Sequence, residues 1–197
     1  GQFPHPCLYS EINAFEWLSL LNSLMNSTND ECLSSCGDVV TLLIENNVPA
    51  DHLEYLFNET GMYDRIYTHQ LGDNWPDIGD LILMGKDLVI FWEQTGNQSY
   101  PWLHDFGKFG WTTNYAEDNP EDMECTVHRG DGSQPVWHLN NWLKSMFGVA
   151  DPYRSEEVND YDFLLNRSIE CWEIMDNRPT FIAVDYWEDG EVTNVTI

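Results

Sequence analysis

The stretch Arg178-Pro-Thr-Phe-Ile-Ala-Val-Asp-Tyr-Trp-Glu-Asp-Gly-Glu-Val192 carries the strongest structural signal in the chain. Its apolar run from Phe181 to Val184 predicts a strand that is covered on both faces, as strands of parallel α/β sheets are. Asp185 follows this strand directly, and an acidic turn that contains glycine comes next. Because α/β barrels place their chemistry at the carboxyl ends of their strands, Asp185 is a candidate site residue.

Working outward from this strand, apolar segments of strand type alternate with segments of helix type. The sequence predicts further strands at residues 39–44, 88–92 and 136–139. It predicts helices at residues 10–25, 51–57, 75–85 and 163–175, and one more that follows residue 139 and ends at Phe147. Such alternation implies parallel strands and the α/β class. The chain has neither an internal repeat nor a clear linker, so residues 1–197 are interpreted as a single domain or part-domain.

Three details complete this prediction. Ser10 is expected to begin the first helix, and Asp51 and Glu54 are expected to cap the second as a pair. Residues 97–134 are rich in loops and in aromatic side chains. The aromatic cluster at residues 100–115 could line a lipid or ligand site, although packing in the core and loops is the simpler interpretation.

The charge of the chain limits its partners. Thirty-four acidic residues face only 8 Lys and Arg, which gives a formal net charge of −26. Such a surface repels nucleic acids and anionic membranes at neutral pH. With 42% hydrophobic and 14% aromatic residues, the chain is nevertheless rich enough in apolar side chains to fold.

Several features predict a secreted glycoprotein. Asn-x-Ser/Thr sequons begin at Asn26, Asn58, Asn97, Asn166 and Asn194. No apolar run approaches the roughly 18 residues that a transmembrane helix needs. The chain begins at Gly1 without Met and without a signal peptide, so we expect a processed form.

The five cysteines also indicate an oxidising compartment. We favour a disulfide between Cys125 and Cys171. The remaining Cys7, Cys32 and Cys36 would then form one internal bond and one bond to another chain, because an odd count leaves one cysteine over. The sequence does not fix this connectivity.

Five segments, in order, resemble the phosphatidylinositol-specific phospholipase C X-domain-like phosphodiesterases. Asp38-Val-Val-Thr-Leu-Leu-Ile-Glu-Asn46 is similar to the E-V-V-T-L-x-x-E-N strand of that family. Trp75-Pro-Asp-Ile-Gly-Asp-Leu-Ile82 with the following Gly85 to Phe91 resembles W-P-T-L-x-E-M-I-x-x-G-K-R-L-V-V-F. Cys125-Thr-Val-His-Arg-Gly130 resembles C-T-x-x-R-G, Val136 to Trp142 resembles L-x-L-x-N-H-F, and the final strand resembles R-P-N-F-I-A-V-D-F.

The resemblance implies the later strands of a (β/α)₈ TIM barrel, because the strand that carries the first catalytic histidine of the family has no counterpart here. A complete barrel typically takes about 250 residues. A partial barrel would expose two sheet edges. We therefore expect a separate N-terminal half chain of the same precursor to complete it, with a disulfide as one way of linking the two chains. A self-paired or rebuilt half barrel, or a smaller α/β domain, are the alternatives.

The family's chemistry assigns expected roles to four residues. His5, in Phe3-Pro-His-Pro-Cys7, matches the second catalytic histidine, although Pro6 stands where glycine is usual. Asp185 matches the acid that orients an imidazole. Arg129 would contact the phosphate, and Glu45 resembles a glutamate that binds Ca²⁺ in some members, so Ca²⁺ is an expected cofactor if any is needed. His138, inside a strand-like run, is interpreted as a core residue.

Two functions follow from these observations. The first is a subunit of a secreted phosphodiesterase that cleaves a phospholipid or glycerophosphodiester head group, with histidine as general acid and base. The second is an acidic secreted glycoprotein without catalysis, which uses the same scaffold for ligand binding, storage or structure. The strand-end acids favour the first, whereas the missing histidine, Pro6 and the extreme charge favour the second.

Overall fold

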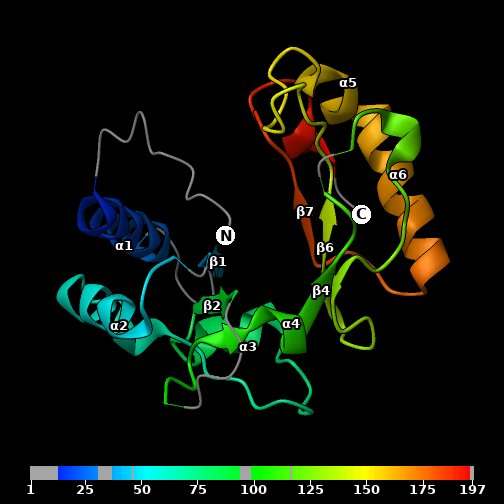
Figure 1. The fold of residues 1–197 in the computed structure, drawn as a ribbon. Coiled ribbons are helices and arrows are strands. Elements are labelled where there is room, and N and C mark those ends of the chain that lie inside the picture. The colour runs from blue at the N-terminus through cyan, green and yellow to red at the C-terminus, as the bar shows by residue number, and fades with distance from the viewer. Residues whose placement is uncertain (1–12, 31–36, 46, 94–98, 116, 196–197) are drawn as a thin grey trace. The chain divides into compact units, whose positions relative to one another are not determined.

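The computed structural model describes residues 13–30, 37–45, 47–93, 99–115 and 117–195 (Figure 1). The chain forms two compact units, Gly1–Phe106 and Gly107–Ile197. Each unit is built on a small sheet of mainly parallel strands with helices beside it. The predicted α/β class is therefore confirmed. That residues 1–197 form one domain or part-domain stays a prediction.

The first unit consists of three parallel strands and the segments that connect them. In chain order its elements are α1 (Ala14–Asp30), β1 (Val40–Ile44), α2 (Ala50–Glu59), η1 (Tyr63–Arg65), α3 (Ile78–Leu83), β2 (Leu88–Trp92) and β3 (His104–Asp105). The sheet order is β1-β2-β3. All five residues of β2 are buried, as the continuous apolar run predicts for a central strand.

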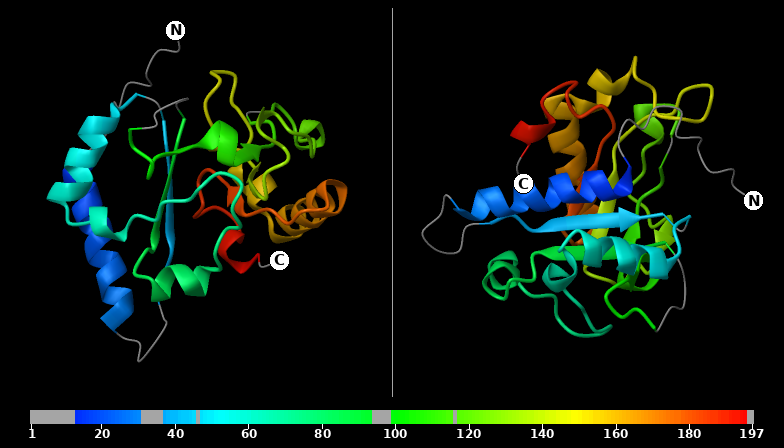
Figure 2. Two further views of the ribbon diagram at one scale, coloured as in Figure 1. Left: turned by 90° about the horizontal axis from the view of Figure 1, so that it is seen from below. Right: turned by 90° about the vertical axis from the view of Figure 1, so that its left-hand side faces the viewer.

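The core of the first unit lies between its sheet and two helices. Figure 2 shows α1 and α2 side by side along β1. Leu18 of α1 and Phe57 of α2 are buried in one cluster with Leu88, Ile90 and Trp92, which alternate along β2 and so share one face. The helices therefore cover one face of this sheet, and β1 stays at its edge.

The two predicted helix caps in this unit are wrong, although the second helix begins within one residue of its predicted start. Helix α1 begins after Asn13, not at Ser10: the Asn13 Oδ1 accepts a hydrogen bond from the Glu16 N–H, and a Glu16 carboxylate oxygen accepts one from the Asn13 N–H. This is a reciprocal capping box. Helix α2 follows Pro49, without a side-chain cap. Asp51 instead lies in the first turn, where its negative charge interacts favourably with the positive end of the helix dipole.

The second unit holds a mixed four-stranded sheet. After α4 (Phe106–Phe109), at the boundary between the units, come β4 (Gly110–Thr112), η2 (Pro120–Asp122), β5 (Arg129–Gly130), β6 (Val136–Asn140), α5 (Ser155–Asn159), α6 (Tyr161–Met175), β7 (Phe181–Ala183) and η3 (Val192–Asn194). The sheet order is β5-β4-β6-β7, with β4, β6 and β7 parallel and β5 antiparallel to β4. Gly130 is required here, because a Cβ would lie 2.2 Å from the carbonyl oxygen of Gly110.

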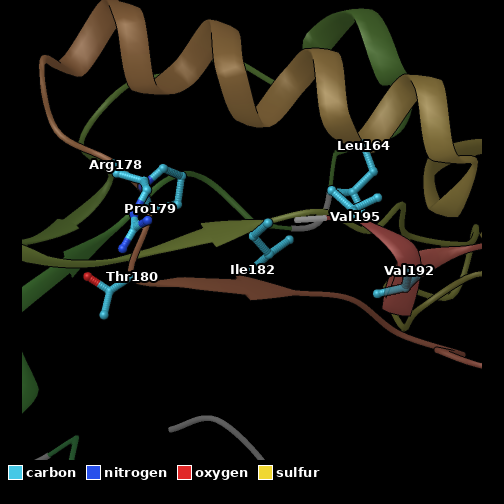
Figure 3. Close-up of a pocket in the computed structure, with 7 residues that line it drawn as sticks. All are labelled: Leu164, Arg178, Pro179, Thr180, Ile182, Val192 and Val195. Atoms are coloured by element: carbon cyan, nitrogen blue, oxygen red, sulfur yellow. The ribbon is translucent and has the colours of Figure 1, made fainter. Parts of the chain in front are cut away.

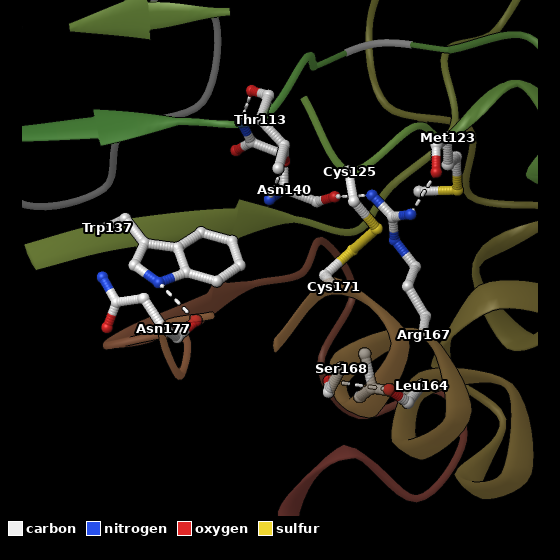
Figure 4. Close-up of a disulfide and its surroundings, with 10 residues drawn as sticks. All are labelled: Thr113, Met123, Cys125, Trp137, Asn140, Leu164, Arg167, Ser168, Cys171 and Asn177. Carbon is white, nitrogen blue, oxygen red and sulfur yellow. Dashed lines mark hydrogen bonds between the residues drawn. A yellow bond between two sulfur atoms is a disulfide. The ribbon is translucent and has the colours of Figure 1, made fainter. Parts of the chain in front are cut away.

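Helix α6 packs on one face of this sheet. Trp111 and Trp137 stack there with 4.4 Å between ring centroids, next to Leu139. The predicted Cys125–Cys171 disulfide is confirmed, and it joins the β4–β5 connection to α6 (Figure 4). Cys7, Cys32 and Cys36 lie outside the described residues.

The predicted helix between β6 and Phe147 is wrong. Residues 143–151 form a hairpin, in which the Asp151 N–H bonds the Leu143 carbonyl and the Ser145 N–H bonds the Val149 carbonyl. Gly148 has a φ of +74°, which favours glycine and ends any helix. The apolar pairs at 142–143 and 146–147 have helical spacing. Only the first pair is packed, because Leu143 is buried whereas Met146 and Phe147 are exposed.

Candidate functional site

Asp185 lies at the carboxyl end of β7, where the sequence predicts it. The turn that contains Asp185 is fixed by hydrogen bonds from Asn159, which is fully buried. The Asn159 Nδ2 donates hydrogen bonds to the backbone carbonyls of Asp185 (2.9 Å) and Tyr186 (3.1 Å). The Asn159 carbonyl in turn accepts the N–H of Glu191. Asn159 therefore holds both ends of the acidic turn, the first through its side-chain amide and the second through its backbone carbonyl.

The backbone at this turn is strained. Tyr186 has a φ of +52°, which is rare for residues other than glycine. Such strain persists only where the surroundings enforce it, and it is concentrated at functional sites. Burial raises the pKa of the Asp185 carboxyl, which is half-exposed. An opposite charge beside it, such as an imidazolium, would be stabilised by this carboxylate and would reverse the shift.

Amides form the ends of the neighbouring strands. Asn140 ends β6, and its Nδ2 donates a hydrogen bond to the carbonyl of Thr113, which follows β4 (2.8 Å). Asn141 is fully buried, and its N–H bonds the carbonyl of Ala183 in β7 (2.8 Å). The carboxyl ends of three parallel strands are thus tied together just before Asp185. This arrangement gives a rigid base for a site at that edge.

Arg129 lies in a different part of the same sheet. It is opposite Thr112 in β4, and Thr112 is opposite His138 in β6. The three side chains therefore share one face. Burial, and then the Arg129 charge, lower the pKa of His138 to about 4, so this ring is neutral at pH 7. The row continues to Phe181, which lies four residues before Asp185. At about 3.3 Å per residue, Arg129 and Asp185 are therefore separated by roughly 13 Å along the strand direction.

Glu45 follows β1 in the first unit. Its carboxylate is exposed and accepts a hydrogen bond from the Asn47 Nδ2 (3.0 Å). Within the described ranges, no three His, Cys, Asp or Glu side chains gather as metal ligands. Since Ca²⁺ takes about six to eight oxygen ligands, Glu45 would need donors from elsewhere in the protein. Its role in binding Ca²⁺ stays a prediction.

Sequence reasoning missed a buried cluster of histidines and aromatics in the first unit. The His104 Nε2 accepts the backbone N–H of His69 (2.9 Å), and its Nδ1 lies 2.8 Å from the Ile90 carbonyl, which it can only approach as a donor. Burial lowers the pKa of His104 to about 4. The His69 ring stacks on Trp75, with 3.8 Å between centroids. Both ring nitrogens of His104 thus make hydrogen bonds to the backbone. A contact between residues 35 positions apart, such as that of His69 with His104, leaves no local pattern in the sequence.

The remaining predicted residues have simpler outcomes. His5 and Asn97 lie outside the described residues. The side chains of the other four sequon asparagines are exposed: Asn26, Asn58, Asn166 and Asn194. The aromatics Trp102, Phe106 and Trp111 are buried, which supports core packing over a lipid site in that segment. No described helix is long and apolar enough to cross a membrane.

Residues 12–197 match the PI-PLC X 1 family. The chain belongs to the PI-PLC X family. No solved structure matches the chain.

One relative of this PI-PLC X chain is an uncharacterised secreted protein of Arthroderma benhamiae. The two are 23% identical over 195 residues, which cover 87% of this chain and 44% of the relative. The chain therefore spans less than half the length of that relative.

The PI-PLC X chain has an open groove beside its last strand (Figure 3). It has a volume of about 390 Å³ and lies between α6, β7 and the C-terminal segment. Leu164, Ile182, Val192 and Val195 give it apolar walls, with Arg178 at one end. Strand β7 is the edge of its sheet, as β1 is in the first unit. The prediction of a strand covered on both faces is therefore wrong for β7, because all three of its residues are only partly buried. Among the described strands, β1 and β7 each have a hydrogen-bonded neighbour on one side only.

Proposed function

We propose that the protein is part of a secreted phosphodiesterase that cleaves a phospholipid or glycerophosphodiester head group. Membership of the PI-PLC X family supports this reaction class. The observation that carries the proposal is Asp185, held in a strained turn at the carboxyl end of β7 by the buried Asn159. A site built in this way is pre-organised, and it lies where α/β proteins of this kind bind their substrates.

The residues have the following proposed roles. A histidine takes the proton of a substrate hydroxyl, which attacks the phosphorus, and a second histidine protonates the leaving oxygen. Asp185 orients one imidazole and stabilises its charged form, as a carboxylate in contact with imidazolium does. Arg129 supplies positive charge to the phosphate, and His5 is proposed as one of the two histidines. No step is assigned to a metal.

We expect Asp185→Asn to lower the rate of head-group release by about 10- to 100-fold, because an amide cannot stabilise an imidazolium. The rate is measured with the native protein by ³¹P NMR of the released phosphate ester. Glu188→Gln is the matched control. It removes the same charge from an exposed position in the same turn and should leave the rate unchanged. Equal rates for Asp185→Asn and the native protein would remove Asp185 from the site.

We also propose that further strands complete a TIM barrel around these two units and that they belong to a separate N-terminal half chain of the same precursor. The relative of more than twice this length supports a larger whole. The open edges of β1 and β7 are where such strands would pair. Exposed apolar side chains beside β1, on the surface of α1, fit the same interpretation: Trp17, Leu20 and Leu24.

An intact-mass measurement on native material tests this arrangement. We expect reduction to release a second polypeptide, because the odd cysteine count leaves one cysteine for another chain. Glycosidase treatment before the measurement separates glycan mass from protein mass. A mass of 22.9 kDa plus glycans, with and without reductant, would contradict a disulfide-linked partner. Size-exclusion chromatography of the same material would then reveal a noncovalent one.

Secretion and glycosylation are proposed for related reasons. The relative is a secreted protein, and the Cys125–Cys171 disulfide fits an oxidising compartment. The exposed asparagines of four sequons are open to a glycan.

The second candidate function is an acidic secreted glycoprotein that binds or stores a ligand without catalysis. The net charge of −26 favours it, and so does the structural use of the His104 ring. If the native protein and its partner release no head group from phospholipids or glycerophosphodiesters, this function replaces the first.

A further inference from the structure

One edge of β2 is completed by a side chain instead of a strand. On the side away from β1, the Leu88 carbonyl at the start of β2 accepts the N–H of Tyr67 (2.8 Å), and β3 pairs with the last two residues. Between these two contacts the Ile90 carbonyl accepts a hydrogen bond from the Nδ1 of His104 (2.8 Å). The His104 ring therefore lies where a backbone peptide would otherwise continue the sheet.

The His104 ring also makes both hydrogen bonds of such a peptide. Its Nδ1–H donates to the Ile90 carbonyl, and its Nε2 accepts the backbone N–H of His69 (2.9 Å). Because a carbonyl only accepts and an N–H only donates, the ring fits as the neutral tautomer that carries its proton on Nδ1. In the imidazolium form Nε2 would also carry a proton, and it would face the His69 N–H as a second donor.

The segment that His104 holds carries a cluster of aromatic rings. The His69 ring stacks on Trp75, with 3.8 Å between centroids. The Trp75 ring in turn lies 5.8 Å from the rings of Phe91 and His104. Loss of the bond between His104 and His69 would therefore loosen residues 66–75 together.

The titratable groups around the two histidine rings belong to the same two segments. Apart from each other, the rings have as neighbours the Tyr67 hydroxyl, 3.3 Å from the His69 Nδ1, and Asp73, whose charge acts on His69. Asp105 follows His104 in β3 and so points to the opposite face of the sheet. Burial lowers the pKa of both histidines, that of His104 to about 4. Both rings are therefore neutral at pH 7.

We propose that His104 makes the first unit an acid-sensitive switch: protonation of its ring breaks the bond to His69 and opens residues 66–75 away from β2. The inference goes beyond the proposed function and requires no turnover. The closed form is the one described above, and in the open form the rings of His69 and Trp75 are released to solvent.

The direction of the effect follows from the balance of protons. In the open form the pKa of His104 returns to its ordinary value of 6.5, so below that pH the open form binds more protons than the closed form. The stability of the closed form is complete above about pH 6.5 and is lost as the pH falls toward 4. The acidic surface has the opposite effect, because protonation of carboxylates weakens the repulsion within a chain of net charge −26.

Hydrogen exchange of the native protein, read by mass spectrometry from pH 7 to pH 4 and corrected for the intrinsic exchange rate, tests the proposal. We expect the opening equilibrium constant of residues 66–75 to rise about 100-fold over this range. His104→Gln keeps a side-chain acceptor and donor but binds no proton, so its opening should be greater at pH 7 and nearly independent of pH. Exchange is read peptide by peptide, which separates this effect from that of the buried His138 in the second unit.

His52→Gln is the matched control, because it removes an exposed imidazole from α2 in the same unit and should keep the native response. If His104→Gln does not fold, the ¹⁵N NMR shifts of the His104 ring in the native protein decide, since they should report the neutral Nδ1–H tautomer at pH 6 and a midpoint near pH 4. Three results would each overturn the proposal: unchanged or stronger protection of residues 66–75 in acid, an equal response in His104→Gln, or a His104 ring that is protonated near pH 6.5 while those residues stay protected.

Discussion

Replacing both Cys125 and Cys171 with alanine is expected to lower the free energy of unfolding of the second unit by about 4 kcal/mol. The bond closes a chain segment of 46 residues, and the loss of unfolded-state entropy grows with the length of that loop. Cys171 is fully buried beside Trp137 and Leu139, so a small cavity adds to the cost. Urea denaturation, followed by Trp fluorescence, measures the change.

Reductant provides the control for this prediction. The reduced native protein should approach the stability of the Cys125→Ala/Cys171→Ala variant. Any change that reductant makes to the stability of the variant measures the contribution of disulfides formed by the other cysteines. Even without the bond, Arg167 of α6 tethers the same connection through the Met123 carbonyl, and it also donates a hydrogen bond to the Asn140 carbonyl at the end of β6 (Figure 4). If the variant is as stable as the native protein, the disulfide is not part of the native fold.

The long elements of the fold could be predicted because their signals are local. The apolar runs that became β1, β2, β6 and β7 lie within one or two residues of their predicted ends, as does α6. Strands β3, β4 and β5 are two or three residues long, too short to show a period of two. They exist because neighbouring strands offer them partners, which is information that the sequence holds only through the whole fold.

The hairpin after β6 shows how a local signal can mislead. Trp142, Leu143, Met146 and Phe147 have the spacing of one helix face. Hydrogen bonds to distant residues prevail there. In a helix the Lys144 N–H would bond the carbonyl four residues earlier, but here it bonds the Glu117 carbonyl. The exposure of Met146 and Phe147 was missed for this reason, because a helix would have turned them toward the core. Apolar residues directly before a glycine, as in Phe147-Gly148, are the signal that could have indicated a turn.

The candidate site divides in the same way. The position of Asp185 follows from the general rule for strand ends, and the Cys125–Cys171 pairing proved right. The hydrogen bond from the Asn159 side chain to the Asp185 carbonyl could not be predicted, since the two residues are 26 positions apart and meet only in the folded unit. Nor could the sequence indicate that Arg129 and Asp185 lie at different levels of the sheet.

The second large effect is expected for Trp137→Ala, which should cost about 3–5 kcal/mol of the free energy of unfolding of the second unit. Trp137 is fully buried, and its ring lies parallel to that of Trp111. Its indole N–H donates to the Asn177 carbonyl (3.1 Å), a bond that fixes the loop between α6 and β7. Alanine would therefore leave a large cavity in the core and an acceptor without its donor.

Two further variants separate these contributions. Trp137→Phe keeps most of the ring and removes the N–H, so its cost should be smaller, at about 1–3 kcal/mol. Trp187→Ala removes an indole that is largely exposed and should change stability by less than about 0.5 kcal/mol. Urea denaturation measures all three. If Trp137→Ala cost no more stability than Trp187→Ala, the stacked pair of Trp111 and Trp137 would not form the core of this unit. The packing of α6 on the sheet would then be wrong as well, and with it the surroundings of the Cys125–Cys171 bond and of the strand ends before Asp185.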